Sequence, residues 1–249
     1  FRHLQCGRRR PLARRSGVTL VWTIHNLQPH ESRWPRLDFF VRRHLIRFVD
    51  RAIAHSTPAK EAFCARYGAS GEHIDVIPHG NYRGSYGSRI PRSEARARPS
   101  ISKQFCAVFF GMIRPYKGVE DLLRSWSSAP EGVELLIAGA PLDDEVRAEI
   151  ERLGNQPRVR LMLRKIEDAE IPLLFSAADI ALFPFQGVLT SGSVVLAMGY
   201  DTPIVSPRLP GTLEVLAGAD DLLYDSCDPH ALVNAVRTAT RWDLDPLRA

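Results

Sequence analysis

The chain has 249 residues, of which 45% are hydrophobic and 24% charged, the ordinary balance of a globular protein with one or two domains. No apolar run approaches the roughly 20 residues that a membrane-spanning helix needs, so we expect a soluble or peripheral protein. The net charge of +5 is uneven, because residues 1–51 are strongly basic and the remainder has an acidic excess. The basic part indicates either an anionic partner, such as nucleic acid, lipid headgroups or a phosphorylated substrate, or simply a solvated face.

The start of the chain is unlike a natural N-terminus. Residues 1–17, FRHLQCGRRRPLARRSG, contain no initiator methionine and no signal-peptide pattern, and they are typical of a helix end closing onto a turn. We therefore expect a fragment that lacks its first strands.

The cysteines indicate the compartment. Four are present, Cys6, Cys64, Cys106 and Cys227, without the paired spacing of a zinc site. The last three have apolar neighbours and are expected to be buried thiols, which favours the reducing cytoplasm.

The first half predicts strands alternating with helices. We expect strands at 18–24, 51–56 and 73–80, and helices at 34–50 and 57–68. The first helix has an expected apolar face of Leu37, Phe40, Val41, Leu45 and Phe48, with Arg36, Arg43 and Arg47 opposite. The second helix has Thr57 as its expected cap, Pro58 at its first position and Gly68 at its end.

Residues 81–104 lack periodicity and predict a linker or long loop, which is the best candidate for a domain boundary. The alternation then returns. Strands are expected at 105–111, 133–140, 159–164, 180–185, 203–207 and 221–225, and helices near 118–129, 143–154, 168–177, 191–199, 212–217 and 229–240. This order predicts an α/β fold with a parallel, doubly wound sheet. Ligands bind at the carboxyl ends of such strands, so the loops after 111, 140, 185 and 207 are candidate sites.

The loop after the strand at 105–111 reads GMIRPYKGVEDLL. Gly111 lets the backbone approach a ligand, and Arg114 and Lys117 lie three residues apart just before a helix expected to begin at Gly118. Two cations beside the free N–H groups of a helix start predict a diphosphate site. The alternative is a surface loop with two charges.

A second candidate is the run of small polar residues Thr190, Ser191, Gly192 and Ser193, at the start of the helix near 191–199. Glycine lets a phosphate approach the backbone, and the helix dipole favours an anion there. A plain helix cap would need only one of these residues. In the next such loop, Glu214 is either a helix-capping residue or an acceptor for ligand hydroxyls.

Polar residues also follow the first strand of the chain. His25, Asn26, His30 and Glu31 come after residues 18–24, and His25 is a candidate hydrogen-bond partner or proton carrier. Metal binding by His25, His30 and Glu31 is a weaker alternative. His79, which ends the strand at 73–80, is either structural or functional.

Taken together, these segments resemble a GT-B glycosyltransferase of family 4. The resemblance rests on TIHNLQPHE, AHSTPAKEAF, DVIPHGNY, FFGMIRPYKGVEDLL, LLIAGAP, IPLLFSAADIALFPF, SGSVVLAMGYDTPIVSPRLPGTLEVL and LLYDSCDPHALVNAV, in this order. It implies two Rossmann-like domains facing across a cleft. Residues 1–100 would be the incomplete acceptor-side domain with its linker, and residues 101–249 the nucleotide-sugar domain.

The resemblance also implies roles. Arg114 and Lys117 match the pair that neutralises the sugar-nucleotide diphosphate, so that no metal or other cofactor is required. His25 matches a histidine near the transferred sugar, and Asn26, His30 and His79 fall on the acceptor side. The family's opening strand and glycine-rich loop have no counterpart in this sequence.

Two departures concern the donor site. The family commonly has two glutamates, which align with Val188 and Leu196; the first lies by the donor sugar and the second holds ribose hydroxyls. Arg114 is also displaced by two positions from the usual spacing. A branch with serine and glycine in this segment exists, so the departures do not imply inactivity.

The resemblance implies transfer of a hexose from a UDP- or GDP-linked sugar to a glycolipid or polysaccharide, with retention of anomeric configuration. The expected location is cytoplasmic, at most peripheral on the inner membrane face, with the basic first helix against anionic lipid. The alternatives are a degenerate nucleotide-sugar-binding protein, a sugar-nucleotide epimerase, and nucleic-acid binding, which is disfavoured because no aromatic residues interleave with RRRPLARR.

Overall fold

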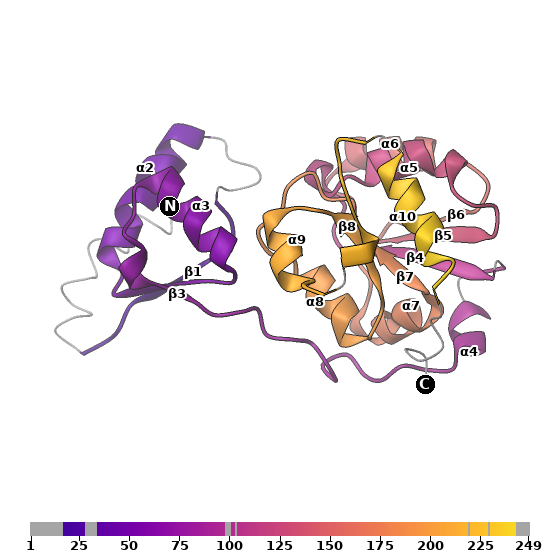
Figure 1. The fold of residues 1–249 in the computed structure, drawn as a ribbon, viewed down its shortest axis with the longest axis horizontal. Helices are drawn as coiled ribbons and strands as arrows, with labels where there is room; N and C mark the ends of the chain where they lie inside the picture. The colour runs from indigo at the N-terminus through magenta and orange to yellow at the C-terminus, as the bar shows by residue number, and fades with distance from the viewer. Residues whose placement is uncertain are drawn as a thin grey trace. The chain divides into compact units, whose positions relative to one another are not determined.

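The computed structural model describes residues 17–27, 34–97, 101–102, 104–218, 220–228 and 230–242 (Figure 1). The chain divides into two compact units, residues 1–79 and residues 80–249. We call them the first and the second unit and describe each by itself.

The first unit contains a parallel sheet of three strands in the order β1-β2-β3, namely β1 (Val21–Ile24), β2 (Arg51–Ala54) and β3 (Ile74–Val76). Val21 pairs with Arg51, and Ala52 pairs with Ile74. The connections are α2 (Pro35–Phe48) and α3 (Thr57–Tyr67), the latter followed by a 3₁₀ turn (Gly71–His73). Each strand lies within its predicted range, so the expected alternation is confirmed.

Helix α3 is built as a capped helix, but its cap is not the predicted one. The hydroxyl of Ser56 accepts a hydrogen bond from the N–H of Ala59, and Thr57 is the first helical residue. Ser56 is extended at φ −156° and is fully buried, which suits a residue in the cap position. The helix ends, as predicted, at Gly68 in the left-handed region.

Helix α2 presents a different face to the unit than its apolar pattern predicts. Ile46 is buried and Phe39 stacks on Tyr67 of α3 with ring centroids 5.2 Å apart. By contrast, the side chains of Leu37 and Phe40 are 51% and 59% exposed. The packed side of the helix includes Phe39 and Ile46, whereas Leu37, Phe40 and Phe48 of the predicted stripe are exposed and its other two members, Val41 and Leu45, are half-buried.

The second unit contains a parallel sheet of six strands in the order β6-β5-β4-β7-β8-β9. The strands are β4 (Phe105–Phe110), β5 (Val133–Ala138), β6 (Val159–Met162), β7 (Ile180–Leu182), β8 (Ile204–Pro207) and β9 (Leu223–Tyr224). The helices are α5 (Val119–Ser125), α6 (Asp144–Gly154), α7 (Ile171–Ala177), α8 (Gly192–Gly199), α9 (Pro210–Val215) and α10 (Ala231–Ala239). Figure 1 shows the strands between α5 and α6 on one side and α7 and α8 on the other. This order is that of a Rossmann fold, and its direction switches between β4 and β7.

The segment predicted as a linker belongs to the second unit. It contains a short helix, α4 (Arg92–Ala97), which packs against α7. Ahead of it, Arg89 donates to the carbonyls of Tyr200 and Phe175, and the N–H of Ile90 donates to Ser176. The division of the chain therefore falls at residues 79/80 rather than near residue 100, because these hydrogen bonds fasten residues 80–97 to the second sheet.

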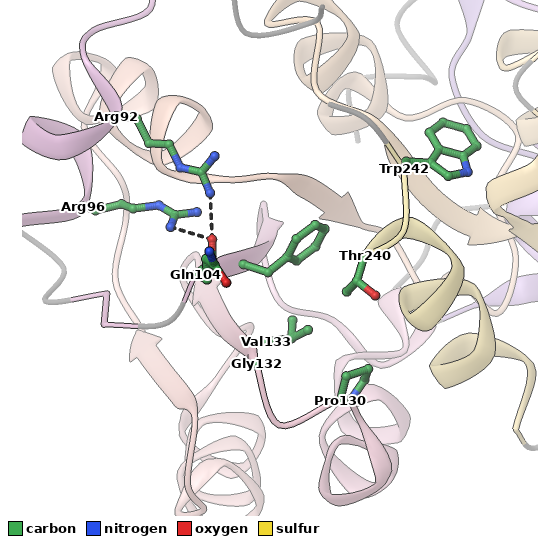
Figure 2. A pocket seen from close by; sticks show the side chains of 9 residues that line it. Arg92, Arg96, Gln104, Pro130, Gly132, Val133, Thr240 and Trp242 are labelled. Carbon is green, nitrogen blue, oxygen red and sulfur yellow. Dashed lines mark hydrogen bonds between the residues drawn. The ribbon is translucent and has the colours of Figure 1, made fainter. Parts of the chain in front are cut away.

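Helix α4 is fixed by a buried carboxylate. Asp179 lies 2.6 Å from guanidinium nitrogens of both Arg92 and Arg96, and it also accepts from the N–H of Cys106 at 2.6 Å. Both arginines also donate to the carbonyl of Gln104 beside a cavity of about 600 Å³ (Figure 2). Phe105 and Val133 line this cavity, so it lies at the amino ends of β4 and β5, away from the predicted site.

The cysteines differ in their surroundings. Cys106 is buried, and burial raises the pKa of its thiol to about 12. Cys64 is half-buried, whereas Cys227 is exposed, which corrects the prediction of a buried thiol because the chain turns at the surface after β9. Within the described residues, no helix is long and apolar enough to cross a membrane.

Candidate active site at the carboxyl edge of the second sheet

The two loops at the switch point of the second sheet are in contact. Gly111 follows β4 with φ +130°, and a Cβ placed on it would lie 2.7 Å from the hydroxyl oxygen of Ser193 in the first turn of α8. Gly111 therefore allows the backbone after β4 to approach the start of α8. The structure thus brings together two of the segments predicted to bind a diphosphate.

A second close approach joins the loop of Arg114 and Lys117 to the loop after β7. Gly118 lies in the left-handed region at φ +70°, and a Cβ there would lie 1.9 Å from the carbonyl oxygen of Pro184. Nearby, the N–H of Gln186 donates to the carbonyl of Tyr116 at 2.9 Å. Helix α5 begins after Gly118, as predicted, but Lys117 lies in a preceding 3₁₀ turn (Pro115–Lys117).

Lys117 is a desolvated cation. Its ammonium nitrogen lies 4.4 Å from the centre of the Phe185 ring, a cation–π distance. Burial, and secondarily the charge of Arg114, lowers the pKa of Lys117 from 10.5 to about 8. In the described part of the chain no carboxylate forms an ion pair with it. An anion bound here would offset both the desolvation of Lys117 and its repulsion by Arg114, because it would supply a counter-charge.

The serine that begins α8 has a buried hydroxyl without a partner. Ser191 occupies the N-cap position, yet its side chain makes no capping hydrogen bond. Its oxygen is buried and is one of two such side-chain atoms without a hydrogen bond in the described residues. The hydroxyl therefore does not cap the helix, which was the alternative role predicted from the sequence. Because an unsatisfied buried hydroxyl is costly, a polar ligand at this helix start would be stabilising.

Tyr82 lies against the same helix start. A Cβ on Gly192 would lie 3.4 Å from the hydroxyl of Tyr82, and the backbone of Tyr82 and Arg83 passes beside Gly199 at the end of α8. Arg83 is paired with Asp201 at 2.5 Å. The space next to Gly192 is thus partly occupied by a phenol, so a phosphate there would meet the Tyr82 hydroxyl as well as the helix backbone.

The other positions predicted for the donor site are Glu214 and Leu196, and neither is shown to contact Lys117 or the start of α8 in the described residues. Glu214 is exposed on α9, whose start packs against the carbonyls of Val188 and Leu189 through Gly211. The cap of α9 is made by Thr212, whose hydroxyl accepts from the N–H of Leu209. Leu196 is buried in the core of the second unit, so it offers no polar atom to a ribose.

In the first unit, His25 and His79 come together with a third histidine. His25, His55 and His79 follow β1, β2 and β3, with ring centroids 5.5 Å apart for the first pair and 5.2 Å for the second. Asn26 accepts a hydrogen bond from Arg42 through its carbonyl. His30 and Glu31 lie outside the described residues, among which no group of three or more potential ligands is arranged to hold a metal ion.

Sequence reasoning missed three residues of these edges. His55 follows its strand as His25 does, so the rule that selected His25 also applies to it. Phe185 was assigned only as the end of an apolar strand, and Tyr82 fell within the predicted linker. Nothing in the sequence indicated that either ring lies beside Lys117 or α8.

Comparison with known families decides the classification. The family model described as glycosyl transferases group 1 matches residues 104–241, more than half of the chain. The chain belongs to this family. A second model, glycosyltransferase family 4, matches residues 4–80.

Named relatives of this group 1 chain are glycosyltransferases. A GDP-mannose:glycolipid 4-beta-D-mannosyltransferase of Xanthomonas campestris pv. campestris is 28% identical over 200 residues, covering 77% of this chain and 51% of that protein. A D-inositol 3-phosphate glycosyltransferase of Segniliparus rotundus is 28% identical over 236 residues, covering 86% and 51%. The chain thus spans about half the length of these curated relatives.

Solved structures show the fold. HepE of Anabaena, in complex with UDP and glucose, is 23% identical with a TM-score of 0.78, covering 96% of this chain and 66% of that one. WaaG, a glycosyltransferase involved in lipopolysaccharide biosynthesis, is 20% identical with a TM-score of 0.70, covering 92% and 67%. The two parallel α/β units are those of the GT-B glycosyltransferase fold.

Proposed function

We propose that this chain is part of a glycosyltransferase that moves a hexose from a UDP- or GDP-linked sugar to a glycolipid or polysaccharide acceptor. The observation that carries the proposal is that the switch point of the second sheet holds both a half-buried, desolvated lysine and a buried serine hydroxyl without a hydrogen bond in the described residues. Among the described residues no carboxylate pairs with Lys117 and no group bonds the hydroxyl of Ser191, and both features favour an oxyanion ligand.

The proposed chemistry is stabilisation of the leaving nucleoside diphosphate. Arg114 and Lys117 supply positive charge, and Thr190, Ser191, Gly192 and Ser193 supply hydroxyl and N–H donors at the start of α8. As the sugar–phosphate bond breaks, negative charge builds on the diphosphate, so donors already in place lower the barrier. The two cations can perform this role without a metal ion or other cofactor.

The acceptor side of the proposal rests on the first unit and on the relatives. His25, Asn26, His30 and His79 are assigned to the acceptor side, with His25 nearest the transferred sugar. The Xanthomonas relative is named for a glycolipid acceptor. A glycolipid or polysaccharide therefore remains the proposed acceptor class. Glu214, by contrast, is proposed to accept hydrogen bonds from hydroxyls of the donor.

We also propose a cytoplasmic enzyme that contacts an anionic membrane surface through α2. Trp34, Leu37 and Phe40 are more than half exposed, and Arg36 and Arg43 are exposed on the same helix. Exposed aromatic and aliphatic side chains beside arginines suit an interfacial helix, with apolar groups in the lipid and cations at the headgroups.

One observation favours a second candidate, a nucleotide-sugar-binding protein without turnover. Leu196 is packed in the core and Val188 is apolar, so both acidic positions of the family are absent here. In this case the donor would bind at α8 but no sugar would leave it.

Transfer assays separate the two candidates. The full chain is incubated with UDP-glucose or GDP-mannose and a lipid extract, and labelled product is measured for the wild type, Lys117→Ala and, as a matched control, the exposed Lys165→Ala. Transfer by the wild type and by the Lys165 variant, but not by the Lys117 variant, is expected. Donor binding without transfer would select the second candidate, and no binding of any nucleotide-sugar would contradict both.

The anomeric configuration of the product tests the remaining part. Retention predicts an α-linked product from an α-linked donor. The name of the Xanthomonas relative specifies a beta linkage, so the coupling constant of the product's anomeric proton is a direct test. A β-linked product from an α-linked donor would contradict retention.

A further inference from the structure

The carboxyl edge of the first sheet carries a row of three imidazoles. His55 lies in the middle, with ring centroids 5.5 Å from His25 and 5.2 Å from His79. One ring follows each of the three strands, so the row follows from the parallel sheet and not from a local turn. Three imidazoles, each with two ring nitrogens that can form hydrogen bonds, are thereby held within one small region.

A helix start and a guanidinium group lie near this row. Helix α3 begins at Thr57, two residues after His55, so the positive end of its dipole lies beside the row. The guanidinium of Arg42 donates to the carbonyl of Asn26, next to His25, at 2.8 Å. The hydroxyl of Tyr67 donates to the carbonyl of Leu27, so the strand-end loop is fixed from two helices.

The hydrogen bond of His55 defines its tautomer. Its Nδ1 lies 3.0 Å from the carbonyl oxygen of Ile77. A carbonyl can only accept, so Nδ1 carries the proton and Nε2 is the nitrogen that remains for a ligand. His55 is therefore held in one ring orientation, whatever binds at the row.

We propose that His25, His55 and His79 form an oxyanion site that takes a phosphate group of the acceptor. The proposal rests on the proposed function, because it assigns the acceptor's phosphate to the unit on the acceptor side. The bound group would accept hydrogen bonds from the imidazoles, and its charge would favour their protonated forms beside the start of α3 and Arg42.

The site should bind more tightly at lower pH. Burial, followed by repulsion from His55 and His79, lowers the pKa of His25, so the empty site disfavours its charged form. A bound anion reverses this preference, and binding is therefore coupled to proton uptake. The charged side chains of the helices in this unit are Arg36, Asp38, Arg42, Arg43 and Arg47 on α2 and Lys60, Glu61 and Arg66 on α3, which packs against β2 and β3.

The test is an NMR titration of the ¹⁵N-labelled full chain with inorganic pyrophosphate, in which ring signals of each histidine are followed. It is performed in the Lys117→Ala background, so that binding at the second sheet does not contribute. Signals of His25, His55 and His79 should move together, with affinity rising up to about tenfold per pH unit from about pH 8 to about pH 6.

Matched variants locate the effect. His55→Gln and His79→Gln should each weaken binding about tenfold or more, while His73→Gln, exposed in a 3₁₀ turn outside the row, should not. Unchanged affinity in both cluster variants, or no response of the three rings at low pH, would overturn the proposal. Nucleotide binding by the second unit would survive that result, so the two proposals fail separately.

Two arms identify the source of the phosphate. One arm titrates the protein with a soluble sugar phosphate. The other mixes it with phosphatidylcholine vesicles that contain phosphatidic acid and compares how much wild type and how much His55→Gln/His79→Gln double variant sediments with them. Loss of sedimentation in the double variant assigns the site to a lipid phosphate. Ring shifts with the soluble phosphate alone assign the site to a soluble acceptor. The absence of both responses would contradict the proposal that the site takes an acceptor phosphate.

Discussion

The two sheets each lead into a helix through a buried serine, and the two serines behave differently. At the first sheet, Ser56 accepts from the N–H of Ala59 and completes the cap of α3. At the second sheet, Ser191 occupies the same position of α8, and its hydroxyl makes no hydrogen bond to the described residues. The first helix start is therefore satisfied within the chain, and the second is left with polar capacity for a ligand.

The same contrast extends to the basic groups. Lys117 at the second sheet is half-buried with its ammonium over the Phe185 ring, and its pKa is lowered to about 8. The second edge thus holds groups that are costly without a ligand, which is the usual signature of a binding site. At the first edge the corresponding groups are the imidazoles of His25, His55 and His79.

The largest expected effect comes from the backbone approach at Gly118. Gly118→Ala should destabilise the chain by about 3 kcal/mol or more, because its Cβ would meet the carbonyl of Pro184 at 1.9 Å and its φ is left-handed. Chemical denaturation measures the change. Gly80→Ala, which follows His79 and meets nothing within 4 Å, should stay within about 0.5 kcal/mol. Equal effects would contradict the close approach.

Next in size is the loss of the half-buried cation of Lys117. Lys117→Met should weaken nucleoside diphosphate binding about ten- to a hundredfold, because a charge-assisted contact is removed. The melting temperature of the ligand-free chain should be unchanged or higher, since methionine can be buried without desolvating a charge. Differential scanning calorimetry of the variant and of Lys165→Met checks both, and a large loss of stability would show that Lys117 is structural.

The two serines provide the next comparison. Ser56→Ala should cost about 1 kcal/mol because the cap of α3 is lost. Ser191→Ala should leave the free chain as stable as before and weaken diphosphate binding about tenfold. Denaturation curves measure the change in stability of both variants, and ligand titrations measure their affinity for the diphosphate. A cost at Ser191 equal to that at Ser56 would remove the distinction.

The smallest effect is on stability as a function of pH. The unfolded chain holds more protons than the folded chain between about pH 8 and 10.5 at Lys117, so stability should rise with pH in this window. The lowered pKa of His25 makes stability fall as pH decreases below 6.5. Melting temperatures measured across pH should show both slopes in the wild type, whereas Lys117→Met should lose the first and His25→Gln the second. An unchanged slope in either variant would contradict the assignment.

Much of the fold could be predicted because parallel strands are short apolar runs separated by amphipathic helices. Gly111, Lys117 and Ser191 could be selected as candidates because each lies in a loop or helix start that follows a predicted parallel strand. What periodicity could not show is which face of a helix meets a partner. In α2 the apolar stripe of Leu37 and Phe40 faces outward, since aromatic stacking of Phe39 sets the packed side.

Contacts distant in sequence explain the other differences. Residues 81–104 were predicted to be a linker because Gly, Ser, Pro and Arg give no period, yet Asp179 and backbone carbonyls bind arginines of this segment. Thr57 and Ser56 are both good caps, and only the backbone angles decide between them. His55 was within reach of the rule for strand ends, whereas Tyr82 depended on a contact across more than a hundred residues.

The central claim is that the second sheet binds a nucleoside diphosphate through Lys117 and the start of α8. Isothermal titration of the full chain with UDP and GDP tests it most directly, using wild type, Lys117→Met and Lys165→Met. We predict that at least one nucleotide binds the wild type and the Lys165 variant equally and binds the Lys117 variant at least about tenfold more weakly. Absence of binding to the wild type, or equal binding by all three proteins, would contradict the claim.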